Sequence, residues 1–136
     1  MNRSAVLVAL ALAAAPAPVR AEEAGDWLRL VPDAYDGEIY SGKAFMPGAT
    51  EFQAGPDGLS GRYAFTEPGA EAIEGTLERC TSPKPRVLLC RWRDRYGTGS
   101  LALTFEEGLQ RFEGYWWADG QTKVRAPWWG RRRIGS

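Results

Sequence analysis

The residues that could do chemistry in this chain are few, and their spacing excludes most enzyme classes. Histidine is absent from all 136 residues, which removes histidine-based catalytic triads and most zinc or copper sites. No phosphate-binding glycine loop or dinucleotide fingerprint occurs, and Gly97-Thr98-Gly99-Ser100 has the wrong spacing for a nucleophile elbow. The sequence therefore predicts no metal, no cofactor and no histidine-dependent catalysis.

Acidic side chains leave one catalytic hypothesis open. Two carboxylates on either side of a glycosidic bond can hydrolyse it. The candidates are Glu74, Glu78, Glu106 and Glu113. No sequence mark sets these four apart, and solvated strand faces account for them equally well. A hydrolase that uses a carboxylate pair is therefore an alternative to a binding function.

The two cysteines, Cys80 and Cys90, predict a structural disulfide. An even cysteine count is typical of an exported chain with paired thiols, whereas a redox motif places Cys-x-x-Cys at the start of a helix. By the chain-entropy account, closing this short loop stabilises the fold by roughly 3 kcal/mol.

Residues 1–21 have the three-part layout of a secretory signal peptide. Arg3 supplies a positive charge, residues 5–15 form an unbroken apolar run of 11, and residues 16–21 are small or helix-breaking. The run is shorter than the roughly 20 residues that a membrane-spanning helix needs. We expect cleavage after Ala21 and no transmembrane anchor after processing. The remaining residues, 22–136, would form one domain in the periplasm or outside the cell.

Charge is divided unevenly along the mature chain. Residues 22–78 hold 12 acidic and three basic side chains, whereas residues 79–136 hold five acidic and 12 basic ones. One interpretation is a single barrel with two faces of complementary charge. The other is a basic surface that binds an anionic partner.

Basic and aromatic residues gather near the C-terminal end. Residues 123–133 carry five positive charges and two tryptophans, and no acidic residue follows Asp119. Arginine pairs with carboxylate or phosphate, and indole rings settle at interfaces. We interpret this basic tail as a candidate contact for an anionic partner, made by Arg125, Trp128, Trp129, Arg131, Arg132 and Arg133. Alternatively, the tryptophans cap a barrel end and the arginines are only solvated.

Period-two alternation and frequent turn signals predict an all-β chain without long helices. The expected strands cover residues 37–45, 50–54, 59–66, 72–80, 86–93, 99–106, 111–118 and 121–126, with Pro127 ending the last. We expect a small antiparallel up-and-down meander of seven to eight strands. Closure into a barrel removes unpaired edges, and a two-sheet sandwich is the alternative.

Three strands share a pattern of apolar residue, glycine and apolar residue on one face. Gly61, Gly75 and Gly114 occupy its centre. A glycine on an inner face permits strong coiling, or lets a neighbouring aromatic ring lie over the backbone. These glycines are therefore expected on the concave face of curved strands.

A resemblance supports the meander. The run from Trp92 to Gly99, followed by Leu101-x-Leu103-x-Phe105 and Phe112-x-Gly114-x-Trp116, resembles small exported bacterial β-meander proteins of unassigned function. The chain is also similar to avidin-like and lipocalin-like barrels in size and meander. The resemblance implies the fold and carries no functional residues.

These observations favour an exported binding protein over an enzyme. Its partner could be an extracytoplasmic protein such as a secreted hydrolase, an envelope polyanion or membrane surface reached through the basic tail, or a small apolar ligand inside the barrel. Nucleic acid is not an expected partner outside the cytoplasm. Many large aromatics favour a filled interior, and an exposed aromatic patch would favour a protein or sugar.

Overall fold

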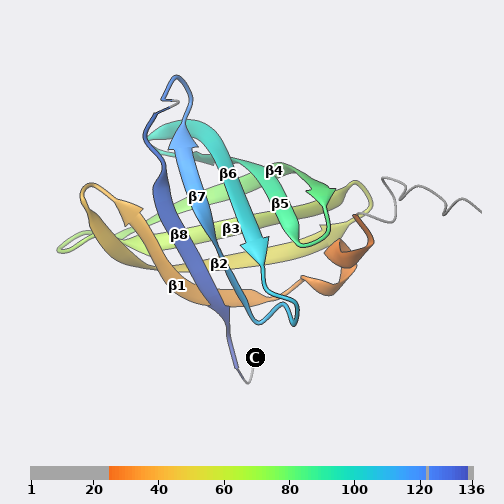
Figure 1. Ribbon diagram of the computed structural model, residues 1–136. Helices are drawn as coiled ribbons and strands as arrows, with labels where there is room; N and C mark the ends of the chain where they lie inside the picture. The colour runs from red at the N-terminus through yellow and green to blue at the C-terminus, as the bar shows by residue number, and fades with distance from the viewer. Residues whose placement is uncertain (1–24, 122, 135–136) are drawn as a thin grey trace, which may run out of the picture.

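The computed structural model describes residues 25–121 and 123–134, so the predicted signal peptide lies outside the described residues (Figure 1). In the described part of the chain, one short 3-10 helix, η1, precedes eight strands. Among the described residues, no helix is long and apolar enough to cross a membrane. The elements are η1 (Asp26–Leu30), β1 (Ala34–Ser41), β2 (Ala44–Gly55), β3 (Gly58–Thr66), β4 (Ala72–Lys84), β5 (Val87–Asp94), β6 (Gly97–Phe105), β7 (Arg111–Ala118) and β8 (Ala126–Arg132).

The strands form a closed antiparallel barrel in simple up-and-down order. Each strand pairs with the next along the chain, and β8 pairs with β1 through five register positions from Tyr35↔Arg132 to Ile39↔Trp128. The predicted meander and its closure are confirmed, and the two-sheet sandwich is not formed. Closure leaves no strand edge unpaired, which removes the usual site of edge-to-edge aggregation.

The first hairpin differs from the sequence prediction of a single strand over residues 37–45. The chain reverses at Gly42 and Lys43, whose φ angles of 61° and 77° form the kind of two-residue turn that matches strand twist. The predicted turn at residues 46–48 instead lies inside β2, where Pro47 faces Glu38. The correct turn was missed because Ser-Gly-Lys is a weaker turn signal than Met-Pro-Gly.

The last strand also differs from its prediction. β8 begins at Ala126, where the predicted strand was to end, and Pro127 lies within β8 opposite Tyr115 instead of ending a strand. The basic tail is therefore mostly a barrel strand, hydrogen-bonded on both sides by β7 and β1.

A bulge in β4 brings the two cysteines together. Ile73 and Leu77 are buried on the inner face, so strict alternation would also turn Arg79 inward. Arg79 instead adopts a φ of 52°, and the register between β4 and β5 shifts at this point. The shift leaves Arg79 exposed and points Cys80 at Cys90, to which it is bonded as predicted. Such a bond is typical of an oxidising compartment.

The short helix η1 lies at one end of the barrel (Figure 1), and aromatic rings fill the interior at that end. Trp27 of η1 packs on Phe105 at 5.2 Å between ring centroids, and its indole N–H donates to Ser82 Oγ at 2.8 Å. Phe105 and Phe112 are fully buried beneath it, with Tyr35 beside them. We call the opposite end, where the β1–β2, β3–β4, β5–β6 and β7–β8 connections lie, the mouth.

The inner-face glycines lie where they were expected, and two of them show why. A Cβ on Gly75 would meet the Tyr63 ring at 2.1 Å, because that ring lies over the β4 backbone. A Cβ on Gly114 would meet the Ala102 carbonyl oxygen at 1.9 Å, because β6 and β7 coil closely there. Gly61 is buried between β2 and β4 in the same way.

Candidate functional site

Alternation along β8 divides the predicted contact residues between the barrel interior and its outer face. Trp128 points inward and keeps only 2% of its surface exposed. Its indole N–H donates to Thr50 Oγ1 at 3.0 Å, and its ring meets Tyr63 edge-on at 4.9 Å. Trp128 is thus a core residue, and a partner at the surface cannot reach it.

Two of the three C-terminal arginines pair with acids of β1 and the residue before it. Arg132 binds Asp33, and Arg133 binds Asp36 through two hydrogen bonds of 2.7 and 3.0 Å. The pKa of Asp33 is lowered by the Ala34 backbone N–H and then by Arg132, and the pKa of Asp36 is lowered by Arg133. These pairs join the acidic and basic halves of the chain where the barrel closes.

The other three predicted contact residues, Arg125, Trp129 and Arg131, lie on the outer face of the barrel. Arg131 is exposed and lies directly opposite Arg111 of β7. The Arg111 guanidinium lies over the Trp129 ring, 4.7 Å from its centroid. Neither arginine forms an ion pair within the described part of the chain. Arg131 thus faces a like charge on β7 and, on β1, the carboxylate of Asp36, which is bonded to Arg133.

A second arginine-on-indole unit lies further along β7. The Arg125 guanidinium is 3.9 Å from the centroid of the Trp117 ring, and Arg125 is exposed. Trp116 packs against the core, so Trp117 and its neighbour lie on opposite faces of the strand, as predicted. Arg125 likewise has no ion pair among the described residues.

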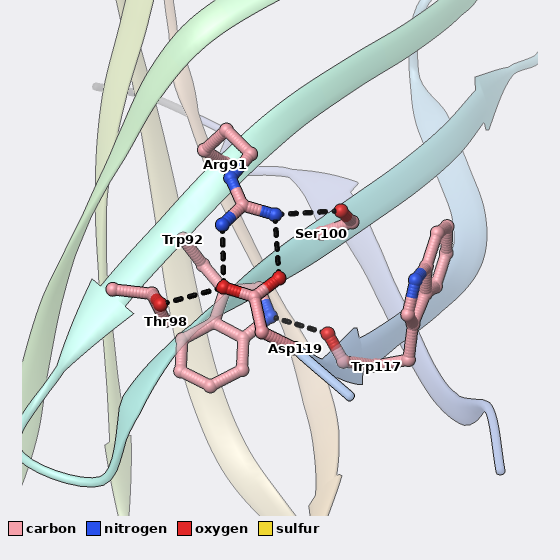
Figure 2. A network of polar contacts seen from close by, with 6 residues as sticks. All are labelled: Arg91, Trp92, Thr98, Ser100, Trp117 and Asp119. Atoms are coloured by element: carbon pink, nitrogen blue, oxygen red, sulfur yellow. Dashed lines mark hydrogen bonds and ion pairs between the residues drawn. The ribbon is translucent and has the colours of Figure 1, made fainter. Parts of the chain in front are cut away.

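A polar network fixes the backbone at this second unit (Figure 2). Arg91 donates twice to the Asp119 carboxylate, at 2.8 and 2.6 Å, and Thr98 donates to the same group at 2.7 Å. The hydrogen bonds from Arg91 and Thr98 lower the pKa of Asp119 to about 2. The Trp92 indole N–H donates to the Trp117 carbonyl oxygen at 3.2 Å. The end of β7 is therefore held against β5 and β6.

Between the two units lie Tyr115, which is 52% exposed, and Pro127 opposite it. From Arg111 to Trp117 the strand extends about 20 Å at the usual rise per residue. Two acids border this surface: Glu113 is exposed opposite Trp129, and Glu38 accepts the Trp129 indole N–H at 3.2 Å. We call the outer-face set the aromatic strip, formed by Arg111, Tyr115, Trp117, Arg125, Trp129 and Arg131.

The strip retains three of the six predicted contact residues, Arg125, Trp129 and Arg131. Sequence reasoning missed Arg111 and Tyr115 because their place beside Trp129 depends on the β7–β8 register. For the part of the strip on β7, the sequence holds one indication: alternation places one tryptophan of the Trp116-Trp117 pair on the outer face.

The four candidate carboxylates do not gather in one place. Glu74 and Glu78 are exposed on β4, Glu106 is exposed just after β6, and Glu113 is exposed on β7. Within residues 25–121 and 123–134, no three acidic or cysteine side chains gather in a way that could hold a metal ion.

Comparisons with protein-family models, with curated proteins and with solved structures gave no match for this chain.

Proposed function

We propose that this chain is an exported, non-enzymatic binding protein that holds a protein partner on the aromatic strip. The observation that carries the proposal is a set of three arginines that form no ion pair with any described residue, two of them stacked on indole rings, around an exposed tyrosine. The proposed place of action is the periplasm or the cell exterior, which the Cys80–Cys90 disulfide favours.

The residue types of the strip suit protein recognition. Tyrosine, tryptophan and arginine are the residues that most often dominate binding energy at protein interfaces. An arginine stacked on an indole ring loses less side-chain freedom when it binds, and its planar fork matches a carboxylate. Arg111 and Arg125 are both held in this way.

The charge pattern favours a protein over a polyanion or an anionic membrane surface. Glu113 is exposed at the border of the strip opposite Trp129, and Glu38 lies at the border beside Trp129. A uniformly negative partner would be repelled by both. A protein can place its carboxylates opposite Arg111, Arg125 and Arg131 and place no carboxylate opposite the two acids.

The test is retention of a partner from the exported fraction of the source cells on the immobilised chain. Tyr115→Ala and Arg131→Gln should each lower retention of one protein at least tenfold. Two matched changes serve as controls: Leu30→Ala, on an apolar side chain that is 67% exposed, and Arg62→Gln, on a side chain that is 76% exposed. Both controls lie outside the strip and should retain the partner fully.

Two results would overturn the proposal. Equal retention by strip and control variants would place binding elsewhere on the barrel. Binding of anionic vesicles or an anionic matrix that Arg131→Gln abolishes, with no protein retained, would assign the strip to a polyanion instead. Raising the salt through about 0.15 M should weaken the polyanion contact strongly, because screening acts on exposed charges.

A further inference from the structure

A small cavity opens at the mouth of the barrel, away from the aromatic strip. Its volume is about 40 Å³. Because one water needs at least 10–15 Å³, this space holds roughly three water-sized groups. Residues from β1, β3, β5, β7 and β8 and from the β5–β6 turn line it: Ile39, Ser41, Tyr63, Phe65, Trp92, Asp94, Tyr96, Trp116 and Trp128. We call it the mouth pocket.

Aromatic rings surround the mouth pocket, and most of the neighbouring pairs meet at steep angles. Trp92 and Trp116 meet edge to face, with centroids 5.4 Å apart and planes at 87°. Tyr63 meets Trp128 at 68° and stacks nearly parallel to Phe65. Rings from four strands therefore enclose the pocket from several sides.

The indole N–H groups around the pocket already have acceptors. Trp92 donates to the Trp117 carbonyl, Trp116 donates to the Tyr40 carbonyl at 2.9 Å, and Trp128 donates to Thr50. The Tyr96 hydroxyl donates to Glu67 at 2.6 Å. These side chains consequently offer π surfaces to a guest and no hydrogen-bond donor.

The acidic group of the pocket is Asp94. The Tyr63 hydroxyl donates to Asp94 Oδ2 at 2.6 Å, and the Tyr96 backbone N–H donates to Oδ1 at 2.8 Å. Burial, and then the contact with Asp94, raise the pKa of Tyr63, so that Tyr63 remains a donor. A carboxylate can accept about four hydrogen bonds, so Asp94, which lines the pocket, has acceptor capacity beyond these two.

Asp94 has no ion-pair partner among the residues that the structure describes. The residue is half-buried. Arg93 and Arg95 flank it in sequence and line, together with Asp94, the outer groove over β2 to β5, but neither arginine lines the mouth pocket. A partly desolvated carboxylate beside π faces favours a positive guest over a neutral or negative one.

We propose that the mouth pocket binds the head group of a small alkylammonium ion. The ammonium donates to Asp94, and the attached carbons contact the faces of Trp92 and Trp116. Because the pocket holds only about three heavy atoms, a longer ligand would extend through the mouth into solvent. This site is separate from the aromatic strip, so that either proposal can fail without the other.

Ethylammonium and ethanol make a matched pair of guests, because each has three heavy atoms and only one is charged. The indole N–H signals of the ¹⁵N-labelled chain report the site. Ethylammonium should shift the signals of Trp92, Trp116 and Trp128, leave that of Trp129 unchanged, and saturate at a concentration roughly tenfold below ethanol. Sodium chloride at equal ionic strength is the control for salt.

Asp94→Asn should abolish the preference for ethylammonium, whereas Asp57→Asn, at an exposed acid in the β2–β3 turn at the other end of the barrel, should keep it. The proposal is overturned if ethanol and ethylammonium saturate alike in the unaltered chain, or if ethylammonium leaves the three pocket signals unmoved. The comparison of guests in the unaltered chain decides the matter even if Asp94→Asn does not fold.

Discussion

The inner and outer faces of β7 and β8 carry the same residue types in opposite roles. On the inner face, the indole N–H groups of Trp116 and Trp128 donate hydrogen bonds to groups of the barrel, and both rings pack against its core. On the outer face, Trp117 and Trp129 lie under the guanidinium groups of Arg125 and Arg111. Composition alone cannot separate these roles, because two adjacent tryptophans contribute one ring to each face.

The arginines of β8 divide in a similar way. Arg132 and Arg133 are held by Asp33 and Asp36 at the seam of the barrel, whereas Arg131 faces another arginine and forms no ion pair in the described part of the chain. Closure of the barrel thus uses part of the positive charge and leaves the rest at the surface. The interpretation of complementary charge within one barrel applies to Arg132 and Arg133, and a basic surface for an anionic partner stays a prediction for Arg131.

The largest expected difference between the faces is at Trp128 and Trp129. Trp128→Ala should cost roughly 3–5 kcal/mol, because it empties a core site and leaves the buried Thr50 hydroxyl without its donor. Trp129→Ala should cost about 1 kcal/mol or less. Urea denaturation of both variants measures this, and equal costs would contradict the division of roles.

A second contrast concerns glycines. Gly114→Ala would place a Cβ 1.9 Å from a backbone oxygen of β6, and should destabilise the fold by about 2 kcal/mol or more. Gly108→Ala, in the β6–β7 turn, meets only the Gln110 side chain at 3.8 Å and should stay within about 0.5 kcal/mol of the parent. Similar midpoints for the two variants would show that close coiling of β6 on β7 is not needed.

A smaller difference is expected between Arg132→Gln and Arg131→Gln. Arg132→Gln removes the partner of Asp33 and should lower the denaturation midpoint measurably at neutral pH. Arg131→Gln should leave the midpoint nearly unchanged, because it removes both the repulsion from Arg111 and the attraction to Asp36, the register partners of Arg131 on either side. If Arg131→Gln lowered the midpoint and Arg132→Gln did not, the contact between Arg132 and Asp33 would not be what stabilises the pairing of β8 with β1.

The smallest expected effect is the acid dependence of the Arg91–Asp119 network. Asp119 has a pKa of about 2 against an ordinary value of 3.8, so its contribution is complete above about pH 4 and is lost as the pH falls toward 2. Asp119→Asn and Arg91→Gln should both flatten the change of melting temperature over that window. If the melting temperature of both variants changed with pH as it does in the parent, the Arg91–Asp119 network would not contribute to stability.

Sequence patterning was sufficient for the closed meander and for the disulfide, because alternation and paired cysteines are local signals. The boundaries of β1, β2 and β8 were not predicted. At Gly42-Lys43 the turn depends on two positive φ angles, and at Pro127 the strand continues because its partners on both sides continue. The aromatic strip could be predicted only in part, because the neighbours of Trp129 are set by strand register.

The most direct test of the central claim uses a photoreactive phenylalanine analogue placed at position 115 or at position 62 of the chain in the source cells. Both side chains are exposed, but only Tyr115 belongs to the aromatic strip. After irradiation, position 115 should yield a covalent adduct with a different protein, and position 62 should yield none. An adduct of that protein at position 62 and none at position 115 would contradict a partner on the outer face of β7 and β8.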